Sequence, residues 1–454
     1  MKSDDRQGAL CFLAALIPSL VWWVVLLPGT FSTDSLQVVS QIRSGTWNDS
    51  HTNAYTLFVW ITSFGGRVWS FVALTQVILL SLGLASLGRA IISRGYASRD
   101  VYTAIAVLAL MPQFGSFAVT AWKDVPSSAG ALMFAASLIS EREPSRVMSR
   151  ADLLTFLGAL LLASFRWNGP IALLMVCIYL AATRQKSKVS LLSITLTALV
   201  IGGSSLVLPQ RLHLAESTVW FHLEIRELHD IAYVVRSSPD AFAKGDLDLL
   251  QQIMPLENWE RGGASCETVD VLQYEEFTRN APASYEATRK LLPELRALWR
   301  RILVERPSEI LKVRLCRASG ALSPIYFGKH PTLGIWGAGS PDPELARARI
   351  FPPLESTFSN IGERILRPEW MKTIFLNASL WNVLSLLILW RQRARRFYGR
   401  ALVVSASIIC SVALGAVAHD ARYVAGALLI AQLFVFVTTI ESLRQLWRAF
   451  KQRA

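Results

Sequence analysis

Charge and cysteine are both scarce in this chain. Only 17% of its 454 residues are charged and only five are cysteine, whereas 52% are hydrophobic. Soluble domains carry about 25% charged residues, so this composition excludes an ordinary soluble protein. Five cysteines in so long a chain exclude a small disulfide scaffold. Glycine and proline show no repeat, which excludes a collagen-like chain. The composition therefore indicates an integral membrane protein.

Long hydrophobic runs occur at ten places. Each run is long enough, or within a few residues of long enough, to cross a hydrocarbon core of about 30 Å as a helix. We therefore predict an all-α polytopic membrane protein with about ten transmembrane helices. The runs cover residues 10–27, 68–88, 101–117, 126–140, 153–165, 169–183, 189–208, 373–390, 401–418 and 424–440.

Charges in the connecting segments predict the orientation of the helices. With a cytoplasmic N-terminus, the inner segments hold 20 Lys and Arg, and the short outer segments hold five. Basic residues are generally enriched on the cytoplasmic side. Merging runs 153–165 and 169–183 into one helix would move the basic segment 391–400 outside, so we reject that reading. Both termini are expected in the cytoplasm, and the first run is expected to remain as an uncleaved anchor in the cell membrane.

The chain is predicted to form two membrane modules and one exported domain. Residues 1–208 form seven helices, and residues 372–454 form three helices with a basic tail. Between them, residues 209–371 carry 20 Lys and Arg against 22 Asp and Glu, as a translocated domain can. Apolar spacing in this domain predicts helices and its Gly and Pro predict loops. The expected helices are Ala215–Val235, Tyr285–Leu303 and Pro307–Arg317, and the expected loops are Ser323–Pro343 and Pro352-Pro353.

Two of the five cysteines fall in the predicted exported domain. Cys266 and Cys316 would face an oxidising compartment, where a disulfide is permitted. Sequence alone does not supply the geometry, so their pairing stays open. Cys11, Cys177 and Cys410 fall within predicted spans and are expected to be packing residues.

The chain places its unusual polar residues at the outer ends of predicted spans. Ionisable groups at membrane depth are costly, so a cluster at one level predicts a functional site. Taken singly, each has a plainer explanation: Asp34 as a helix N-cap supported by Gln37, and the others as interfacial anchors. Four outer segments carry these residues: Asp34 with His51, then Lys123-Asp124, then Arg166-Trp167-Asn168-Gly169, and last His419-Asp420-Ala421-Arg422-Tyr423.

The chemistry of this set points to a phosphate held beside lipid. Lys123, Arg166 and Arg422 suit a phosphate or diphosphate group. A carboxylate nearby can act as general base toward a hydroxyl or amine. A nucleotide donor is disfavoured, because Gly262-Gly263 has none of the neighbours of a nucleotide-binding loop. Together these residues describe group transfer from a lipid-linked phosphate donor.

The same segments resemble the glycosyltransferase C (GT-C) superfamily of polytopic enzymes, and within it a group of little-characterised bacterial membrane proteins. Asp34 matches the acidic residue in the first outer loop of that superfamily, and Lys123-Asp124 matches a Lys-Asp pair in the second. The third segment resembles an Arg-Asn-Asn-Gly signature, with Trp167 in place of the first Asn. Arg422-Tyr423 resembles an Arg-Tyr pair before the last spans, and His51-Thr52 stands where the group has His-Pro.

The resemblance implies an inverting transfer of a sugar from a polyprenyl-phosphate donor to a cell-envelope polymer, lipid or protein. Asp34 would be the catalytic base and Asp124 a second catalytic carboxylate. Some superfamily members need Mg²⁺ or Mn²⁺ and others do not, so a divalent cation on Asp34 and Asp124, with His51, stays open. The donor phosphate is expected on Lys123, Arg166 and Arg422, and the substrate on His51, Asn168, Asp420 and Tyr423. Acceptor contacts are expected from Tyr326, His330, Trp336 and Asp342.

Two other functions remain as alternatives. A transporter or flippase for a lipid-linked substrate would show broken helices and polar groups near the bilayer midplane. A non-catalytic scaffold displaying residues 209–371 would tolerate replacement of Asp34 and Arg422. Basic clusters on the inner side, such as that around Arg444, are expected to contact anionic membrane lipids and not nucleic acid.

Overall fold

Helices account for the regular structure in the part of the chain that is described, so the all-α prediction is confirmed there. One isolated β-bridge joins Thr30 and Thr120. The chain forms two compact units: Met1–Ala215 with Thr332–Ser411 and Ala421–Ala454, and Glu216–Pro331 with Val412–Asp420. The computed structural model describes residues 3–48, 51–140, 150–183, 219–281, 284–322, 342, 344–346, 352–366, 368–391, 397–415 and 420–453.

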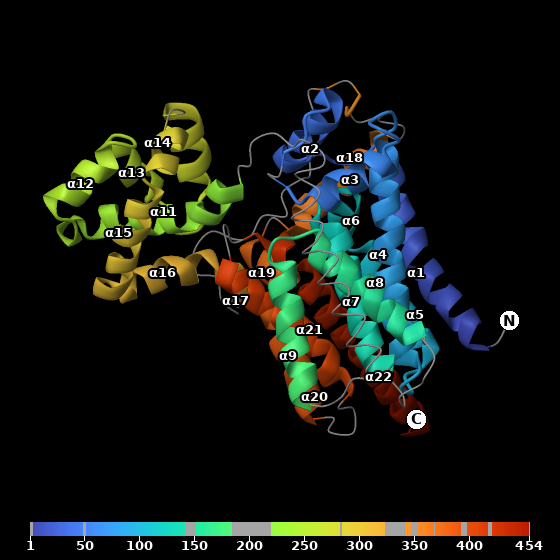
Figure 1. Ribbon diagram of the computed structural model, residues 1–454. Helices are drawn as coiled ribbons and strands as arrows, with labels where there is room; N and C mark the ends of the chain where they lie inside the picture. The colour runs from blue at the N-terminus through green and yellow to red at the C-terminus, as the bar shows by residue number, and fades with distance from the viewer. Residues whose placement is uncertain are drawn as a thin grey trace. The chain divides into compact units, whose positions relative to one another are not determined.

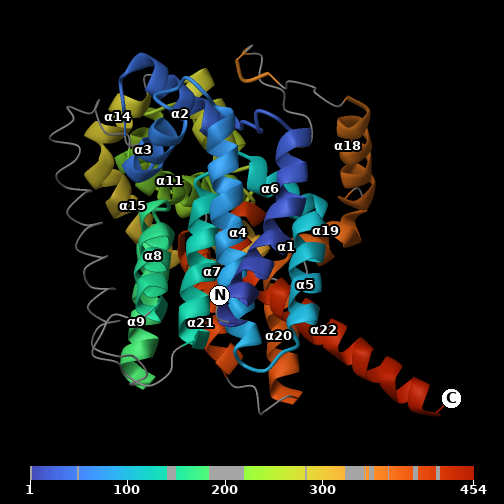
Figure 2. The same cartoon turned by 90° about the vertical axis from the view of Figure 1, so that its right-hand side faces the viewer.

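The first unit holds the apolar helices (Figures 1 and 2). Its elements are α1 (Ser3–Val25), α2 (Thr33–Ser44), α3 (Asn53–Thr62), α4 (Ser70–Ile92), α5 (Ser98–Leu110), α6 (Pro112–Val119), α7 (Asp124–Ser140), α8 (Arg150–Ser164), α9 (Gly169–Thr183), α18 (Pro352–Leu366), α19 (Glu369–Leu376), α20 (Ala378–Arg391), α21 (Phe397–Gly415), η4 (Ala421–Val424) and α22 (Ala425–Arg453). The last residues of α21, from Val412 on, group with the second unit.

Four helices among the described residues are long and apolar enough to cross a membrane, within α1, α4, α21 and η4–α22. The count rises to six if two bent pairs, α5 with α6 and α19 with α20, each make one span. Helices α8 and α9 are apolar but shorter, and the expected span 189–208 lies outside the described residues. Large side chains of α1 face outward, among them Leu13 at 44% and Ile17 at 59% exposure, as expected for contact with lipid.

Helix α7 is the centre of the first unit. Every residue from Asp124 to Ile139 is buried, and the helix packs against α4 and α8 (Figure 1). Gly130 and Gly158 allow the close approach of α7 and α8, because a Cβ at Gly130 would lie 2.7 Å from the Gly158 carbonyl oxygen. Small residues let membrane helices approach in this way. The contact fixes the start of α7 beside the end of α8.

The segment after the first span forms the short helix α2. Its apolar face, with Val38 and Ile42, packs against Tyr55 and Val59 of α3. Ser32 is the N-cap of this helix and forms a capping box with Ser35. The capping alternative for Asp34 is therefore wrong, because Asp34 lies inside the first turn and its carboxylate does not cap the helix.

The last helix of the first unit, α22, carries a basic and apolar C-terminal segment. In Figure 2 these turns project away from the other helices of the unit. Leu443, Leu446, Trp447 and Phe450 are all exposed there, and Lys451 lies 5.3 Å from the centre of the Trp447 ring. Such a surface suits an interface with anionic lipid.

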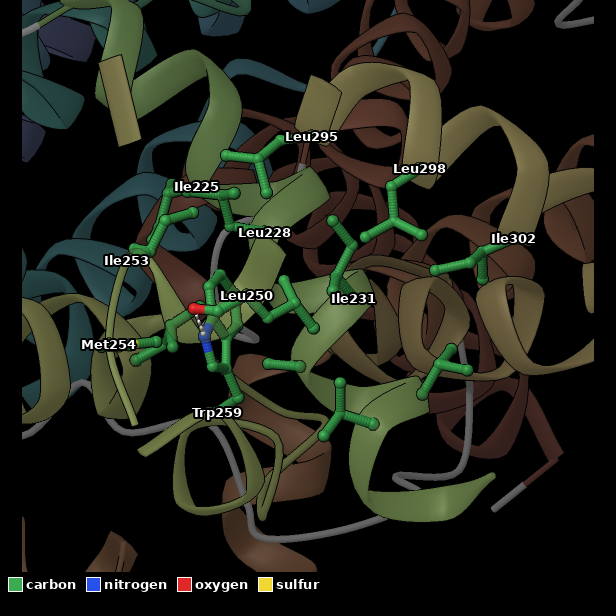
Figure 3. Close-up of a cluster of buried hydrophobic side chains, with 14 of the residues drawn as sticks. Ile225, Leu228, Ile231, Leu250, Ile253, Met254, Trp259, Leu295, Leu298 and Ile302 are labelled. Atoms are coloured by element: carbon green, nitrogen blue, oxygen red, sulfur yellow. Dashed lines mark hydrogen bonds between the residues drawn. The ribbon is translucent and has the colours of Figure 1, made fainter. Parts of the chain in front are cut away.

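The second unit contains the helices of the polar segment. Ile231 of α11, Trp259 of α13 and Ile302 of α15 are fully buried in its core (Figure 3), and the Trp259 Nε1–H donates to the Leu250 carbonyl oxygen at 3.1 Å. Its elements are α11 (Val219–Ser237), η1 (Pro239–Ala241), α12 (Lys244–Gln251), α13 (Leu256–Gly262), the π-helix η2 (Val271–Asn280), α14 (Ser284–Lys290), α15 (Leu292–Glu305), α16 (Pro307–Arg317) and α17 (Ser319–Leu322).

Two parts of the polar segment are arranged otherwise than the sequence suggests. The described residues between 342 and 371, expected in the exported domain, cluster with the first unit. Pro352-Pro353, expected to form a loop, begins helix α18. Proline is well tolerated in the first turn of a helix, because the N–H that it lacks has no partner there. The predicted loop Ser323–Pro343 lies almost wholly outside the described residues.

The second unit contains a disulfide between Cys266 and Cys316, which answers the question that the sequence left open. The bond closes a loop of 50 residues and ties the end of α16 to the segment after α13. Of the other cysteines, Cys11 is buried as expected, whereas Cys410 is exposed on α21.

Replacing both disulfide cysteines with serine is expected to destabilise the second unit. Removing a native disulfide costs about 2–5 kcal/mol, and the cost rises with the length of the closed loop. Thermal unfolding of the purified chain should show a lower transition for the double variant than for the wild type. Adding a thiol reductant should lower the wild-type transition but leave the double variant unchanged. Equal transitions in all four samples would contradict the prediction.

Candidate active site at the ends of the first-unit helices

The segment that follows α1 and the segment that follows α6 are held together by backbone hydrogen bonds. The Thr30 N–H donates to the Val119 carbonyl at 3.1 Å, and the Ala121 N–H donates to the Thr30 carbonyl at 2.9 Å. The Ser35 hydroxyl donates to the Ala121 carbonyl at 2.7 Å, so the first turn of α2 is fixed to the same segment. These bonds place Asp34 beside Lys123 and Asp124, which are about 90 residues later in the chain.

Asp34 forms an ion pair with Arg422. One guanidinium nitrogen, Nη1, donates to Asp34 Oδ2 at 2.9 Å, across 388 residues of sequence. The Arg422 guanidinium also lies 5.0 Å from the centre of the Trp122 ring and 5.1 Å from that of Tyr423. Cations are attracted to aromatic faces in this arrangement. Arg422 is thus held by a carboxylate and by two rings.

Asp124 forms a second, deeper ion pair with Arg166. The Asp124 side chain is 1% exposed and that of Arg166 is 14% exposed. Asp124 Oδ2 is buried and accepts no hydrogen bond from any described residue. A buried carboxylate oxygen normally has a partner, so this atom is available to a donor that enters the site.

The Arg166-Trp167-Asn168-Gly169 segment is shaped by its first and last members. Arg166 Nε donates to Asn168 Oδ1 at 2.9 Å, and Asn168 Nδ2 donates to the Ser411 hydroxyl at 3.0 Å. A Cβ at Gly169 would lie 2.2 Å from the Leu162 carbonyl oxygen, so only glycine fits. Asn168 therefore orients the guanidinium, while Gly169 allows the tight turn between α8 and α9. Trp167 points outward and is 46% exposed.

Lys123 is joined to His51, which was a candidate for substrate contact. Lys123 Nζ lies 3.0 Å from His51 Nδ1, and His51 Nε2 lies 3.1 Å from Gln37 Oε1. A protonated lysine can only donate, so His51 accepts at Nδ1 and donates to Gln37 from Nε2. Burial lowers the pKa of Lys123, whereas the carboxylates of Asp34 and Asp124 raise it, and the net direction is downward. His51 thus positions the ammonium group.

The charges around Asp34 keep its carboxyl ionised. Burial raises the pKa of Asp34, but the cations of Arg422 and Lys123, together with His51, outweigh burial and lower it from 3.8 to about 2. Because the folded pKa is depressed, Asp34 stabilises the fold above pH 3.8, and this contribution is lost as the pH falls toward about 2. Asp34 is therefore a carboxylate at neutral pH, although the bound Arg422 makes it a weak base.

A cavity of about 20 Å³ lies beside Asp124, Arg166 and Arg422. This volume is enough for a water molecule and too small for a sugar. Binding a larger molecule therefore requires side chains to part. Tyr423 lies between the two arginines, 4.7 Å from the Arg166 guanidinium and 5.1 Å from that of Arg422. The cavity is lined by Asp124, Ser127, Ser128, Ala131, Leu162, Arg166, Asn168, Gly169, Ala172, Ile408, Ser411, Arg422, Tyr423 and Gly426.

The structure brings together eight of the nine expected site residues. Asp34, His51, Lys123, Asp124, Arg166, Asn168, Arg422 and Tyr423 are linked by the contacts above.

The other expected residues are Asp420 and the acceptor contacts. Asp420 is half-buried and groups with the second unit. Of the expected acceptor contacts, Asp342 forms an ion pair with Arg43 of α2. Tyr326, His330 and Trp336 lie outside the described residues, as does His419.

Sequence analysis missed the residues that support the site. Gln37 was considered only as a capping partner, and Trp122, which comes directly before Lys123 in the chain, was not singled out. The Gln76 amide nitrogen donates to the Trp122 carbonyl at 2.7 Å and holds that segment against α4. Gln76 and Ser411 are polar residues within apolar spans, and that signal could have identified them.

A divalent metal has a poor fit to this arrangement. Among the described residues, no group of three His, Cys, Asp or Glu side chains could hold a metal ion. Asp34 and Asp124, the ligands that the sequence left open, each form an ion pair with an arginine, and both interact electrostatically with Lys123. Three cations facing two carboxylates favour an anionic ligand.

Comparison of the chain with models of protein families, with curated proteins and with solved structures finds no match.

Proposed function

We propose that this chain is a membrane glycosyltransferase of the GT-C type, which transfers a sugar from a polyprenyl-phosphate donor to a cell-envelope acceptor. The observation that carries the proposal is one cluster in which two carboxylates face Lys123, Arg166 and Arg422 at the ends of apolar helices. Phosphate chemistry suits the three cations, and the adjoining apolar helices suit a lipid carrier. The resemblance of the four short segments to that superfamily is the reason for proposing a sugar as the transferred group.

The disulfide supports an extracytoplasmic location for the site in this proposal. Disulfides such as Cys266–Cys316 persist mainly outside the cytoplasm. The charge asymmetry of the loops gives the same orientation, with about ten spans and both termini cytoplasmic. The donor sugar would then be presented on the outer face, where the envelope acceptor is found.

The proposed reaction is a single displacement at the anomeric carbon of the sugar. An acceptor hydroxyl or amine attacks that carbon, the bond from the carbon to the phosphate oxygen breaks, and polyprenyl phosphate leaves. The acceptor proton passes to Asp34. The configuration inverts because the acceptor attacks the face of the carbon opposite the departing phosphate. Negative charge grows on the departing phosphate, where Lys123, Arg166 and Arg422 stabilise it. Asp124 Oδ2, which accepts no hydrogen bond from the described residues, can accept one from a sugar hydroxyl.

Donor binding has a specific consequence for the base in this scheme. Arg422 is held by Asp34 in the structure, and the same guanidinium is needed by the phosphate. When the phosphate takes Arg422, the proton affinity of Asp34 rises, because an adjacent cation is withdrawn and an anion arrives. The donor thereby prepares the base for the acceptor.

The direct test of the proposal is a turnover assay on the purified full chain. The chain in lipid nanodiscs is incubated with a panel of synthetic polyprenyl-phosphate sugars and an extract of cell-envelope material. Release of free polyprenyl phosphate, with sugar recovered on the acceptor, is the expected result. A chain that moves the intact lipid-linked sugar across the bilayer without releasing polyprenyl phosphate would be a transporter, and the proposal would fail.

Arg422→Gln is expected to shift the pH dependence of the reaction. Asp34 acts as a base only when ionised, so kcat/KM falls as the pH drops through its pKa. In the wild type that pKa is about 2, and the rate should be independent of this group at ordinary acidic pH. Removing the neighbouring cation raises the pKa of Asp34 by about 1–3 units. The acid limb of the profile of kcat/KM against pH therefore moves to higher pH. Arg43→Gln, which removes a cation paired with Asp342, should leave the limb in place; equal limbs in both variants would contradict the prediction.

A further inference from the structure

The second unit contains a larger cavity than the candidate active site. Its volume is about 190 Å³, and it is separate from the residues discussed above. Three arginines from α11 and α16 line it, with Glu227 of α11 and Trp299 of α15. Ala413 and Leu414, in the last turn of α21, give it an apolar wall. The arginines are Arg226, Arg314 and Arg317.

One carboxylate, Asp230, already uses both of its oxygens on this cluster. Asp230 Oδ2 accepts from Arg314 Nε at 2.9 Å, from Arg314 Nη2 at 2.8 Å, and from Trp299 Nε1 at 3.0 Å. Its Oδ1 accepts from Arg317 Nη2. Asp230 is fully buried. A single saturated carboxylate therefore balances two guanidinium groups.

Arg317 is buried with one donor unsatisfied. Its side chain is 2% exposed, and Nη1 donates to His229 Nδ1 at 2.6 Å and to the Arg226 carbonyl at 3.3 Å. His229 accepts this bond as a neutral ring, because burial and the adjacent Arg317 lower its pKa to about 3. Arg317 Nε has no acceptor among the described residues. An unsatisfied buried guanidinium donor is costly, unless a ligand supplies the acceptor.

The remaining charges leave the cavity positive. Arg226 adds a third cation, and Glu227 is the only carboxylate among the described residues that line the cavity. Burial, together with the neighbouring Glu224, raises the pKa of Glu227, while Glu224 forms its own ion pair with Arg296. The cavity therefore brings three guanidinium groups together with two carboxylates, Glu227 at its wall and Asp230 beside it.

We propose that this three-arginine cavity binds a phosphate group. Phosphate is an anion with several acceptor oxygens, so one group can accept from the unsatisfied Arg317 Nε and from the neighbouring guanidinium groups at once. The ligand is either free phosphate or the headgroup of a phospholipid. The second source is considered because Ala413 and Leu414 belong to an apolar helix long enough to cross a membrane. The proposal does not depend on the transferase activity.

Isothermal titration of the full chain tests the proposal in a phosphate-free, non-ionic detergent buffer. The probes are inorganic phosphate and, in a separate arm, dihexanoyl phosphatidic acid below its micelle concentration. Because the candidate active site also carries three cations, the test compares variants of the cavity and does not use total binding. Arg226→Gln is the test variant, because this arginine lines the cavity and lies outside the candidate active site. Arg236→Gln is the matched control on the same helix, where Arg236 is exposed.

One binding event is expected to weaken at least tenfold in Arg226→Gln and to stay within about twofold in Arg236→Gln, because charge-assisted hydrogen bonds to phosphate are strong. Glu227→Gln should tighten the same event, since it removes the opposing carboxylate. Opposite effects of the two substitutions cannot come from misfolding. Binding of inorganic phosphate identifies the free anion, and binding of the short-chain lipid alone identifies a headgroup. Identical titrations for the wild type and all three variants, in both arms, would overturn the proposal.

Discussion

Asp34→Asn is expected to abolish sugar transfer while the chain stays folded. Asparagine keeps the shape of the side chain but cannot take a proton from the acceptor, and loss of a general base typically slows a reaction by about 10²–10⁴-fold. Arg422 keeps its contacts with Trp122 and Tyr423 in the variant. The measurement is kcat for release of polyprenyl phosphate, with thermal unfolding as the check on folding.

Asp342→Asn is the matched control for this experiment. Asp342 is also a carboxylate paired with an arginine in the first unit, but it lies with Arg43 outside the cluster. Its replacement should leave kcat within a factor of about two, because surface ion pairs contribute little. If Asp34→Asn turns over at the wild-type rate, Asp34 is not the base, and Asp124 becomes the next candidate.

Arg166→Gln is expected to cause the largest loss of stability among the site variants. Asp124 is 1% exposed and is paired with Arg166, so removing the arginine leaves a buried charge without compensation. Breaking a buried ion pair in this way costs about 3–5 kcal/mol. Arg43→Gln, which breaks a more exposed pair at the same membrane module, should cost no more than about 1 kcal/mol.

A double variant separates the charge effect from the loss of packing. Asp124→Asn combined with Arg166→Gln removes both charges, so the unfolding temperature should recover part of what Arg166→Gln alone loses. Activity should not recover, because the donor phosphate still lacks one of its cations. If the double variant is no more stable than Arg166→Gln, the carboxylate is not the cause of the loss.

The sequence was sufficient to predict the helical class and most members of the cluster. Apolar runs and loop charges do not depend on tertiary contacts, so periodicity and charge counting identify them. Asp34, Lys123 and Arg422 stood out because charge is otherwise avoided at the ends of the apolar runs. Their common position follows from the arrangement of the helices, with Gly130 against Gly158 as one fixed point.

The pairing within the cluster could not be predicted from the sequence. Nothing in the order of residues indicates that Arg422 pairs with Asp34 while Arg166 pairs with Asp124. The choice depends on side-chain positions set by Trp122 and Tyr423, which separate and hold the two guanidinium groups. The capping prediction for Asp34 failed for a local reason, because Ser32 lies two residues earlier and forms the cap.

The three-arginine cavity of the second unit was not anticipated at all. Arg226, Arg314 and Arg317 lie among many charged residues of a polar segment, and their spacing matches ordinary exposed helix faces. They converge only because α16 packs against α11, with the Cys266–Cys316 disulfide holding the end of α16. Long-range packing of this kind leaves no local sequence signal.

The most direct test of the central claim is a cryo-EM map of the full chain in lipid nanodiscs with added polyprenyl phosphate. The account predicts phosphate density in contact with Lys123, Arg166 and Arg422, and separation of Arg422 from Asp34 relative to the 2.9 Å ion pair described here. Phosphate density elsewhere, with the Asp34–Arg422 pair intact, would contradict the assignment of this cluster as a site for a lipid-phosphate sugar donor.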